Sequence, residues 1–158
     1  MDEKTNVCRI LDQKKVKYTA HTYDPEQAIS GTEVASFLGQ NPDKVFKTLV
    51  TVAKSGKNYV FVIPVEKELD LKKAAKAVGE KSIEMLKSKD LLPLTGYIHG
   101  GCSPIGMKKL FPTTFQQEVL NYDTVMFSAG KIGHQVELNI KDLTKVIPYK
   151  TADIVKED

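Results

Sequence analysis

Sulfur, histidine and long apolar runs are all scarce in this chain of 158 residues. The two cysteines, Cys8 and Cys102, lie far apart and form no CxxC pair, which favours free thiols in a cytoplasmic protein. His21, His99 and His134 fit no HExxH or Cys/His spacing, so we expect no metal and no cofactor. The sequence contains neither eighteen consecutive apolar residues nor a charged-then-apolar amino terminus. We therefore expect neither a membrane span nor a signal peptide.

The remaining composition is ordinary for a globular domain. Apolar residues make up 41% of the chain and charged residues 27%, and 23 basic against 20 acidic side chains give a net charge of +3. A charge this small does not establish nucleic-acid binding, although it does not oppose contact with a polyanion. Because no linker, repeat or low-complexity segment interrupts the chain, we expect one domain over residues 1–158.

Hydrophobic periodicity and turn signals predict the helices and strands. Helical spacing and capping residues indicate helices at 5–15, 30–38, 70–78, 88–92 and 142–146. β-Branched or alternating stretches indicate strands at 17–23, 45–53, 59–63, 82–85, 124–127 and 134–140. Because strands and helices mix without strict βαβ alternation, we expect an α/β protein of the α+β type, with a mixed sheet and helices around it.

Lys47 stands in the middle of the apolar, β-prone run at 45–50. Lysines in strands usually project into solvent, which is the plain interpretation. Strand alternation, however, places Val45 and Leu49 on the same face as the lysine. If that face is concave, the ammonium lies in a partly dry pocket, where it can bind a phosphate or polarise a carbonyl.

A glycine-rich loop, Gly-Gly-Cys-Ser-Pro-Ile-Gly, occupies residues 100–106. A tight turn explains one glycine and one proline, whereas three glycines indicate close approach of the backbone to another group. Consecutive N–H groups in such a loop can form a nest for an oxyanion or a phosphate. Cys102 could be a nucleophile only with a base beside it, and a small filler residue is the simpler interpretation.

A second glycine loop, Ser-Ala-Gly-Lys-Ile-Gly, joins two predicted strands at 128–133. It is either a hairpin connection or part of a site. It is not a Walker A loop, because Ile132 follows the lysine where that motif needs Ser or Thr.

Taken together, these segments resemble the YbaK-type aminoacyl-tRNA deacylases, which are related to the editing domain inserted in bacterial prolyl-tRNA synthetases. The resemblance covers residues 5–155, and the order and spacing of its segments make it specific. The segments are HTY at 21–23, GQNPDKVFKTL at 39–49, ELDLKKAAKAVG at 68–79, TGY at 95–97, GGCSPIG at 100–106 and SAGKIG at 128–133.

This resemblance implies a mixed, mainly antiparallel, barrel-like sheet surrounded by helices, and hydrolysis of Cys-tRNA(Pro) and of Cys-tRNA(Cys). Cysteine and proline have similar volumes, and an apolar pocket separates such pairs by only ~1–3 kcal/mol, so a second site must clear the error. The family acts without a metal or a protein nucleophile. In its cysteine-specific type, the substrate thiol attacks the ester and forms a cysteine thiolactone.

The resemblance also implies roles for individual residues. It makes Lys47 the catalytic lysine that holds the 3′-terminal nucleotide or its phosphate, and Gly101 a backbone contact to the reacting ester. The substrate-binding positions that it implies are Tyr23, Ser30, Gly100, Ser103, Pro104, Gly106, Ser128, Gly130, Gly133 and Gln135. Some relatives have glycine at Ala129, aspartate at Gln135 and an aromatic residue near Ser30. The missing carboxylate alters the charge of the pocket and bears on the amino-acid preference.

Two other functions fit the same residues. One is a deacylase for another ester such as Ala-tRNA(Pro), and the other is a non-catalytic RNA-binding or regulatory module with this fold. The expected partners are the acceptor end of an aminoacyl-tRNA and prolyl-tRNA synthetase in a ternary complex. The lysines on the helix at 70–78 form either a solvated face or a tRNA-backbone contact: Lys72, Lys73 and Lys76.

Overall fold

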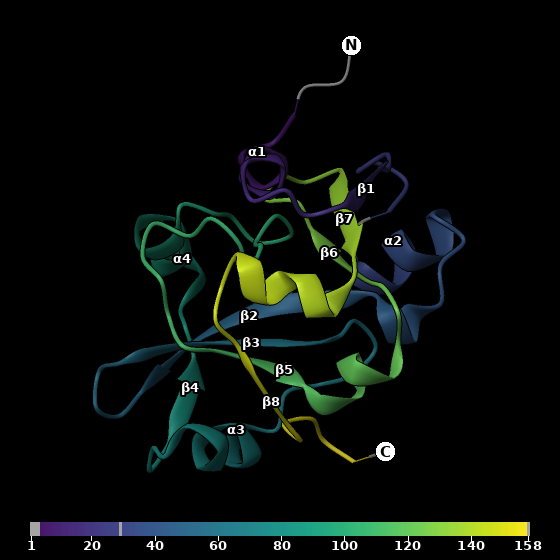
Figure 1. The fold of residues 1–158 in the computed structure, drawn as a ribbon. Helices are drawn as coiled ribbons and strands as arrows, with labels where there is room; N and C mark the ends of the chain where they lie inside the picture. Colours follow the sequence, from purple (N-terminus) through teal and green to yellow (C-terminus); the bar gives the residue numbers. More distant parts are fainter. Residues whose placement is uncertain (1–3, 29, 158) are drawn as a thin grey trace.

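The computed structural model describes residues 4–28 and 30–157, and its strands form two sheets (Figure 1). The small sheet has the order β1-β7-β6, and the large sheet has the order β4-β2-β3-β5-β8. The strands are β1 (Tyr18–Thr22), β2 (Phe46–Ala53), β3 (Asn58–Pro64), β4 (Ile83–Met85), β5 (Thr113–Gln116), β6 (Val125–Ser128), β7 (His134–Leu138) and β8 (Lys150–Ala152).

The pairing confirms the expected mixed, mainly antiparallel α/β fold. The pairs β1–β7, β6–β7, β2–β3 and β2–β4 are antiparallel, whereas β3–β5 and β5–β8 are parallel. An isolated bridge between Val45 and Met126 joins the two sheets. The sequence patterns indicated no strand at β5 or β8. Both are short, and both gain their stability from parallel neighbours that are distant in the chain.

Local signals account for most of the helices, which are α1 (Asn6–Gln13), α2 (Gly31–Phe37), α3 (Leu71–Val78) and α4 (Ser88–Thr95). Thr5, Ser30 and Asp70 cap the first three through side-chain oxygens, and Ser30 forms a capping box with Glu33. The prediction that the fourth helix stops before Pro93 was wrong. It continues to Thr95 and ends where Gly96, at φ 86°, donates its N–H to the Leu92 carbonyl.

Three short 3-10 helices complete the fold: η1 (Pro42–Lys44), η2 (Gln117–Asn121) and η3 (Ile140–Lys145). The last replaces the helix expected at 142–146, and the preceding strand ends at Leu138 instead of residue 140. No helix within the described residues is long and apolar enough to cross a membrane.

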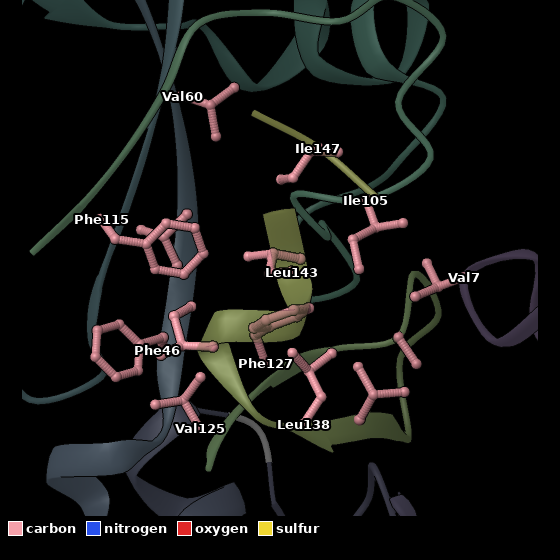
Figure 2. Close-up of a cluster of buried hydrophobic side chains, with 14 of the residues drawn as sticks. Val7, Phe46, Val60, Ile105, Phe115, Val125, Phe127, Leu138, Leu143 and Ile147 are labelled. Carbon is pink, nitrogen blue, oxygen red and sulfur yellow. The ribbon is translucent and has the colours of Figure 1, made fainter. Parts of the chain in front are cut away.

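The main core lies between the two sheets and extends to α1 and η3 (Figure 2). The ring of Phe115 lies 6.2 Å from that of Phe46 and 6.4 Å from that of Phe127, measured between centroids. Each such buried side chain contributes roughly 1.5–3 kcal/mol through apolar burial. A second cluster, which includes Phe61 and Ala74, packs between the large sheet and α3. Helix α3 lies on the side of the large sheet that faces away from the small sheet (Figure 1). Strand β2 therefore has packed side chains on both faces.

Candidate functional site

A cavity of about 540 Å³ opens beside β2, and we call it the β2-edge cavity. Strand β4 pairs with β2 only at Thr51–Ala53, and the bridge to Met126 lies at Val45. The outer edge of β2 has no strand partner between these points among the described residues. Residues 45–50 form one wall, and the others come from the start of α2, from residues 85–91, from the loop at 99–102, and from Tyr23, Val65 and Gln135.

Hydrogen bonds on either side of β2 show which backbone groups face the cavity. Val65 donates its N–H to the Val45 carbonyl, so odd-numbered residues of β2 bond to β3. Leu86 donates to the Val50 carbonyl, so even-numbered residues direct their N–H and C=O groups to the opposite edge. By this alternation the backbone N–H and C=O of Thr48 point towards the cavity.

Lys47 is half-buried in the cavity wall. Burial lowers the pKa of its ammonium, and the charge of Glu68 opposes this effect. None of the described residues forms a hydrogen bond or an ion pair with the ammonium of Lys47. The lining residues include no Asp or Glu, so the side-chain charge of the cavity is positive. An anion such as a phosphate is the natural ligand for this arrangement.

Two buried oxygen atoms of the cavity residues have no hydrogen-bond partner in the described structure: Thr48 Oγ1 and Gln135 Oε1. The Gln135 residue is only 7% exposed. Leaving a buried polar atom unsatisfied costs ~1–3 kcal/mol, which a ligand with a matching donor can recover. A hydrogen-bond donor placed in the cavity would satisfy either oxygen.

The glycine loop at 100–106 contributes Gly100 and Cys102 to the cavity, but not Gly101. Gly101 donates its N–H to the Ile98 carbonyl at 3.0 Å. A Cβ atom at this position would lie 3.1 Å from the backbone nitrogen of Ile132. In this conformation the N–H is already donated within the loop, and the predicted contact of Gly101 with the reacting ester stays a prediction. The missing side chain lets the two glycine loops pack together.

The rest of this loop is directed away from the cavity. The Ser103 hydroxyl is fully buried and accepts a hydrogen bond from the Ile105 N–H at 3.3 Å. Pro104 and Gly106 line a separate small cavity of about 60 Å³. None of these three residues lines the β2-edge cavity, and their predicted substrate contacts stay predictions. All three shape the loop.

The second glycine loop is also structural in this conformation. Ser128 Oγ accepts a hydrogen bond from the Gly130 N–H at 3.1 Å, and Gly130 packs against Tyr97. Gly133 accepts a hydrogen bond from the Tyr23 N–H at 3.0 Å. None of Ser128, Gly130 and Gly133 lines the β2-edge cavity, but the loop holds Tyr23, which does.

Cys102 has a buried thiol, and burial raises its pKa to about 12. The side chain is therefore a protonated thiol near neutral pH and not an activated nucleophile. Among the described residues, no group of three His, Cys, Asp or Glu side chains could hold a metal ion. The chemistry that the cavity can perform is consequently the binding and orientation of an anionic or ester ligand by Lys47, backbone groups and neutral oxygens.

The cavity thus brings together five of the predicted site residues: Tyr23, Ser30, Lys47, Gly100 and Gln135. The Ser30 hydroxyl is already engaged, because it caps α2 through the Glu33 N–H. Sequence reasoning missed the contributions of Thr48, Leu86 and Leu91 to the lining. Thr48 follows the lysine directly, but its importance depends on an unpaired strand edge that no local pattern shows.

Residues 25–146 match the family model of the aminoacyl-tRNA editing domain, and the chain belongs to this family. It is 45% identical over 157 residues to an Enterococcus faecalis protein with the provisional name Cys-tRNA(Pro)/Cys-tRNA(Cys) deacylase EbsC. This match covers 99% of the chain and 96% of EbsC.

Two further relatives are more distant. The chain is 26% identical to proline–tRNA ligase of Shouchella clausii, a match that covers 79% of the chain and 22% of the ligase. A solved structure, provisionally described as a trans-editing enzyme for prolyl-tRNA synthetase, has a TM-score of 0.83 at 22% identity. It covers 98% of this chain and the chain covers 100% of it, which confirms the fold.

Proposed function

We propose that the protein is a trans-editing hydrolase that deacylates Cys-tRNA(Pro), and also Cys-tRNA(Cys). Residues 1–158 act as one editing domain in the cytoplasm, where tRNAs are charged. The name of the Enterococcus faecalis relative supports this substrate. The observation that carries the proposal is the carboxylate-free cavity in which the half-buried ammonium of Lys47 lies beside an apolar wall. Such a cavity suits an uncharged side chain attached to a phosphate-bearing nucleotide.

The proposed reaction uses the substrate's own thiol. The sulfur of the cysteinyl group attacks the ester carbonyl, the C–S bond forms, and the bond from that carbon to the tRNA 3′-oxygen breaks. The thiol gives up its proton, the tRNA oxygen takes one, and water later opens the thiolactone to cysteine. The protein positions these groups, and Lys47 holds the terminal nucleotide through its phosphate. The reaction needs no nucleophile from the protein, so Cys102 takes no part in it.

The proposed partners are the acceptor end of the tRNA and prolyl-tRNA synthetase. The match to part of a proline–tRNA ligase supports the second, because in that protein an editing-type segment shares a chain with the synthetase. A ternary complex would deliver the mischarged tRNA before the ester reaches the ribosome.

A deacylation time course tests the proposal. Cys-tRNA(Pro), Ala-tRNA(Pro) and Pro-tRNA(Pro) are each incubated with wild type, Lys47→Ala and Lys57→Ala, the last being exposed in the β2–β3 turn. We expect loss of cysteine alone, slowed on the order of 100-fold or more in Lys47→Ala and unchanged in Lys57→Ala. Loss of alanine instead would keep the enzyme class and change its substrate. No ester loss above the buffer rate would leave a binding module.

A further inference from the structure

The β2-edge cavity has two chemically different sides, because side chains of β2 alternate between its faces. Lys47 and Leu49 point to the face that packs under α3. Phe46, Thr48 and Val50 point to the core between the sheets. The Thr48 side also includes Cys102 and the partly buried Leu86 and Leu91, which pack on the same core cluster. Thr48 is therefore a polar side chain in an otherwise apolar part of the lining.

The hydroxyl of Thr48 forms no hydrogen bond that would stabilise the described structure. Its Oγ1 is buried and has no partner in the described structure. Thr51, three residues along the same strand, donates its hydroxyl to the Tyr59 carbonyl at 2.9 Å. Thr114 on β5 also has a buried Oγ1 without a partner, but it does not line the cavity. Valine would fill the space at Thr48 without the cost of a buried, unpaired hydroxyl.

We propose that the Thr48 side of the cavity receives the amino-acid side chain of the ester, and that Thr48 Oγ1 hydrogen-bonds to its sulfur. This inference rests on the proposed function. A small apolar recess with one hydroxyl fits a side chain with one polar atom, and a thiol can both donate and accept. The methyl side chain of alanine has no polar atom with which this hydroxyl could form a hydrogen bond. Lys47, on the opposite face of the strand, remains available for the nucleotide phosphate.

The test compares Thr48→Val, Thr48→Ser and the matched control Thr114→Val with wild type. Rates of deacylation are measured for Cys-tRNA(Pro) and Ala-tRNA(Pro). Affinities are measured by calorimetry with adenosine carrying a 3′-cysteinylamide or a 3′-alanylamide, which cannot be hydrolysed as esters. We expect Thr48→Val to lower the kcat/KM and the affinity about three- to tenfold for the cysteinyl compounds only. Thr48→Ser, which keeps the hydroxyl, retains the preference for cysteinyl over alanyl compounds. Thr114→Val keeps wild-type values, and thermal unfolding shows that Thr48→Val is not destabilised.

The deacylation rates test the proposed function, and the affinities for the two amides test the inference about Thr48 separately. If wild type cleaves neither ester, the proposed function falls, while the amide affinities still decide whether Thr48 recognises sulfur. Equal losses for cysteinyl and alanyl compounds would show that Thr48 acts on a part common to both, and would overturn the inference. Unchanged values in Thr48→Val, or failure of wild type to prefer the cysteinylamide, would overturn it as well.

Discussion

Strand β2 and the loop at 128–133 carry equally conspicuous sequence motifs, but the structure uses them differently. Strand β2 lends the cavity Lys47, Thr48 and an unpaired edge. The loop is closed on itself by the bond between Ser128 and Gly130, and it packs against Tyr97. A motif can therefore mark residues that touch a ligand or residues that hold the frame around it. Stability and activity measurements on the same variants separate these two roles.

Gly130→Ala should give the largest loss of stability. An added Cβ would lie 2.9 Å from Tyr97 Cε1 and 3.1 Å from Val7 Cγ2, at a φ of 90°. We expect the free energy of unfolding to fall by ~2–4 kcal/mol, while the folded fraction keeps its kcat/KM within about threefold. Gly56→Ala is the control, because Gly56 has a φ of 89° and no atom within 4 Å of the added Cβ.

Urea denaturation of both variants isolates the steric contact from the backbone strain, which is nearly the same at the two positions. Equal destabilisation of both variants would show that the contact of the added Cβ with Tyr97 contributes nothing to the loss of stability. A large loss of kcat/KM in folded Gly130→Ala would place this loop in the site after all.

The lowered pKa of the Glu137 carboxyl should make the stability of the protein depend on pH. Burial alone would raise the pKa of this carboxyl, but hydrogen bonds from Thr124, His21 and Lys44 outweigh it and lower the pKa to about 2. A group with a lowered folded-state pKa stabilises the protein above its unfolded-state pKa and loses that effect as the pH falls. The stabilisation is therefore present at pH 7 and lost between about pH 5 and pH 2.

Glu137→Gln should remove this acid sensitivity. Urea unfolding at pH 7 and pH 3 should show a loss of ~1–3 kcal/mol in wild type on acidification, and a clearly smaller loss in the variant. Glu84→Gln, at an exposed position on β4, serves as the control and should behave like wild type. The same acid loss in wild type and Glu137→Gln would show that the network around Glu137 does not contribute.

The salt dependence of tRNA binding should show the smallest effect. Lys72 and Lys76 of α3 are exposed, whereas Lys73 is held by Asp153 and by the Val155 carbonyl. If α3 contacts the tRNA backbone, Lys72→Gln with Lys76→Gln should reduce the slope of log K against log salt by about 1–2. Filter binding measures the slope, and an unchanged value would exclude α3 as the tRNA face.

Local signals in the sequence predicted most of the fold. The capping box at Ser30 and the cap at Asp70 act within a few residues, so a linear pattern contains them. Strands β5 and β8 depend on parallel partners far along the chain. Their identity is a tertiary property, and a four-residue or three-residue stretch does not reveal it.

The candidate site was predictable in part for the same reason. Lys47 is visible because it interrupts an apolar strand, and Gln135 because it departs from a family pattern. That Gly101 packs against Ile132, and that Leu86 and Leu91 line the cavity, follows only from the three-dimensional arrangement. The motifs located the region of the cavity but did not identify which residues line it.

The central claim is that the unpaired edge of β2, with Lys47, is the place where the aminoacyl ester binds. A crystal structure with adenosine 5′-phosphate carrying a 3′-cysteinylamide tests this claim most directly. The account predicts the cysteinyl group along the edge at Thr48 and the phosphate at the Lys47 ammonium. A ligand bound at the loop at 128–133 instead, with an empty β2-edge cavity, would contradict the account.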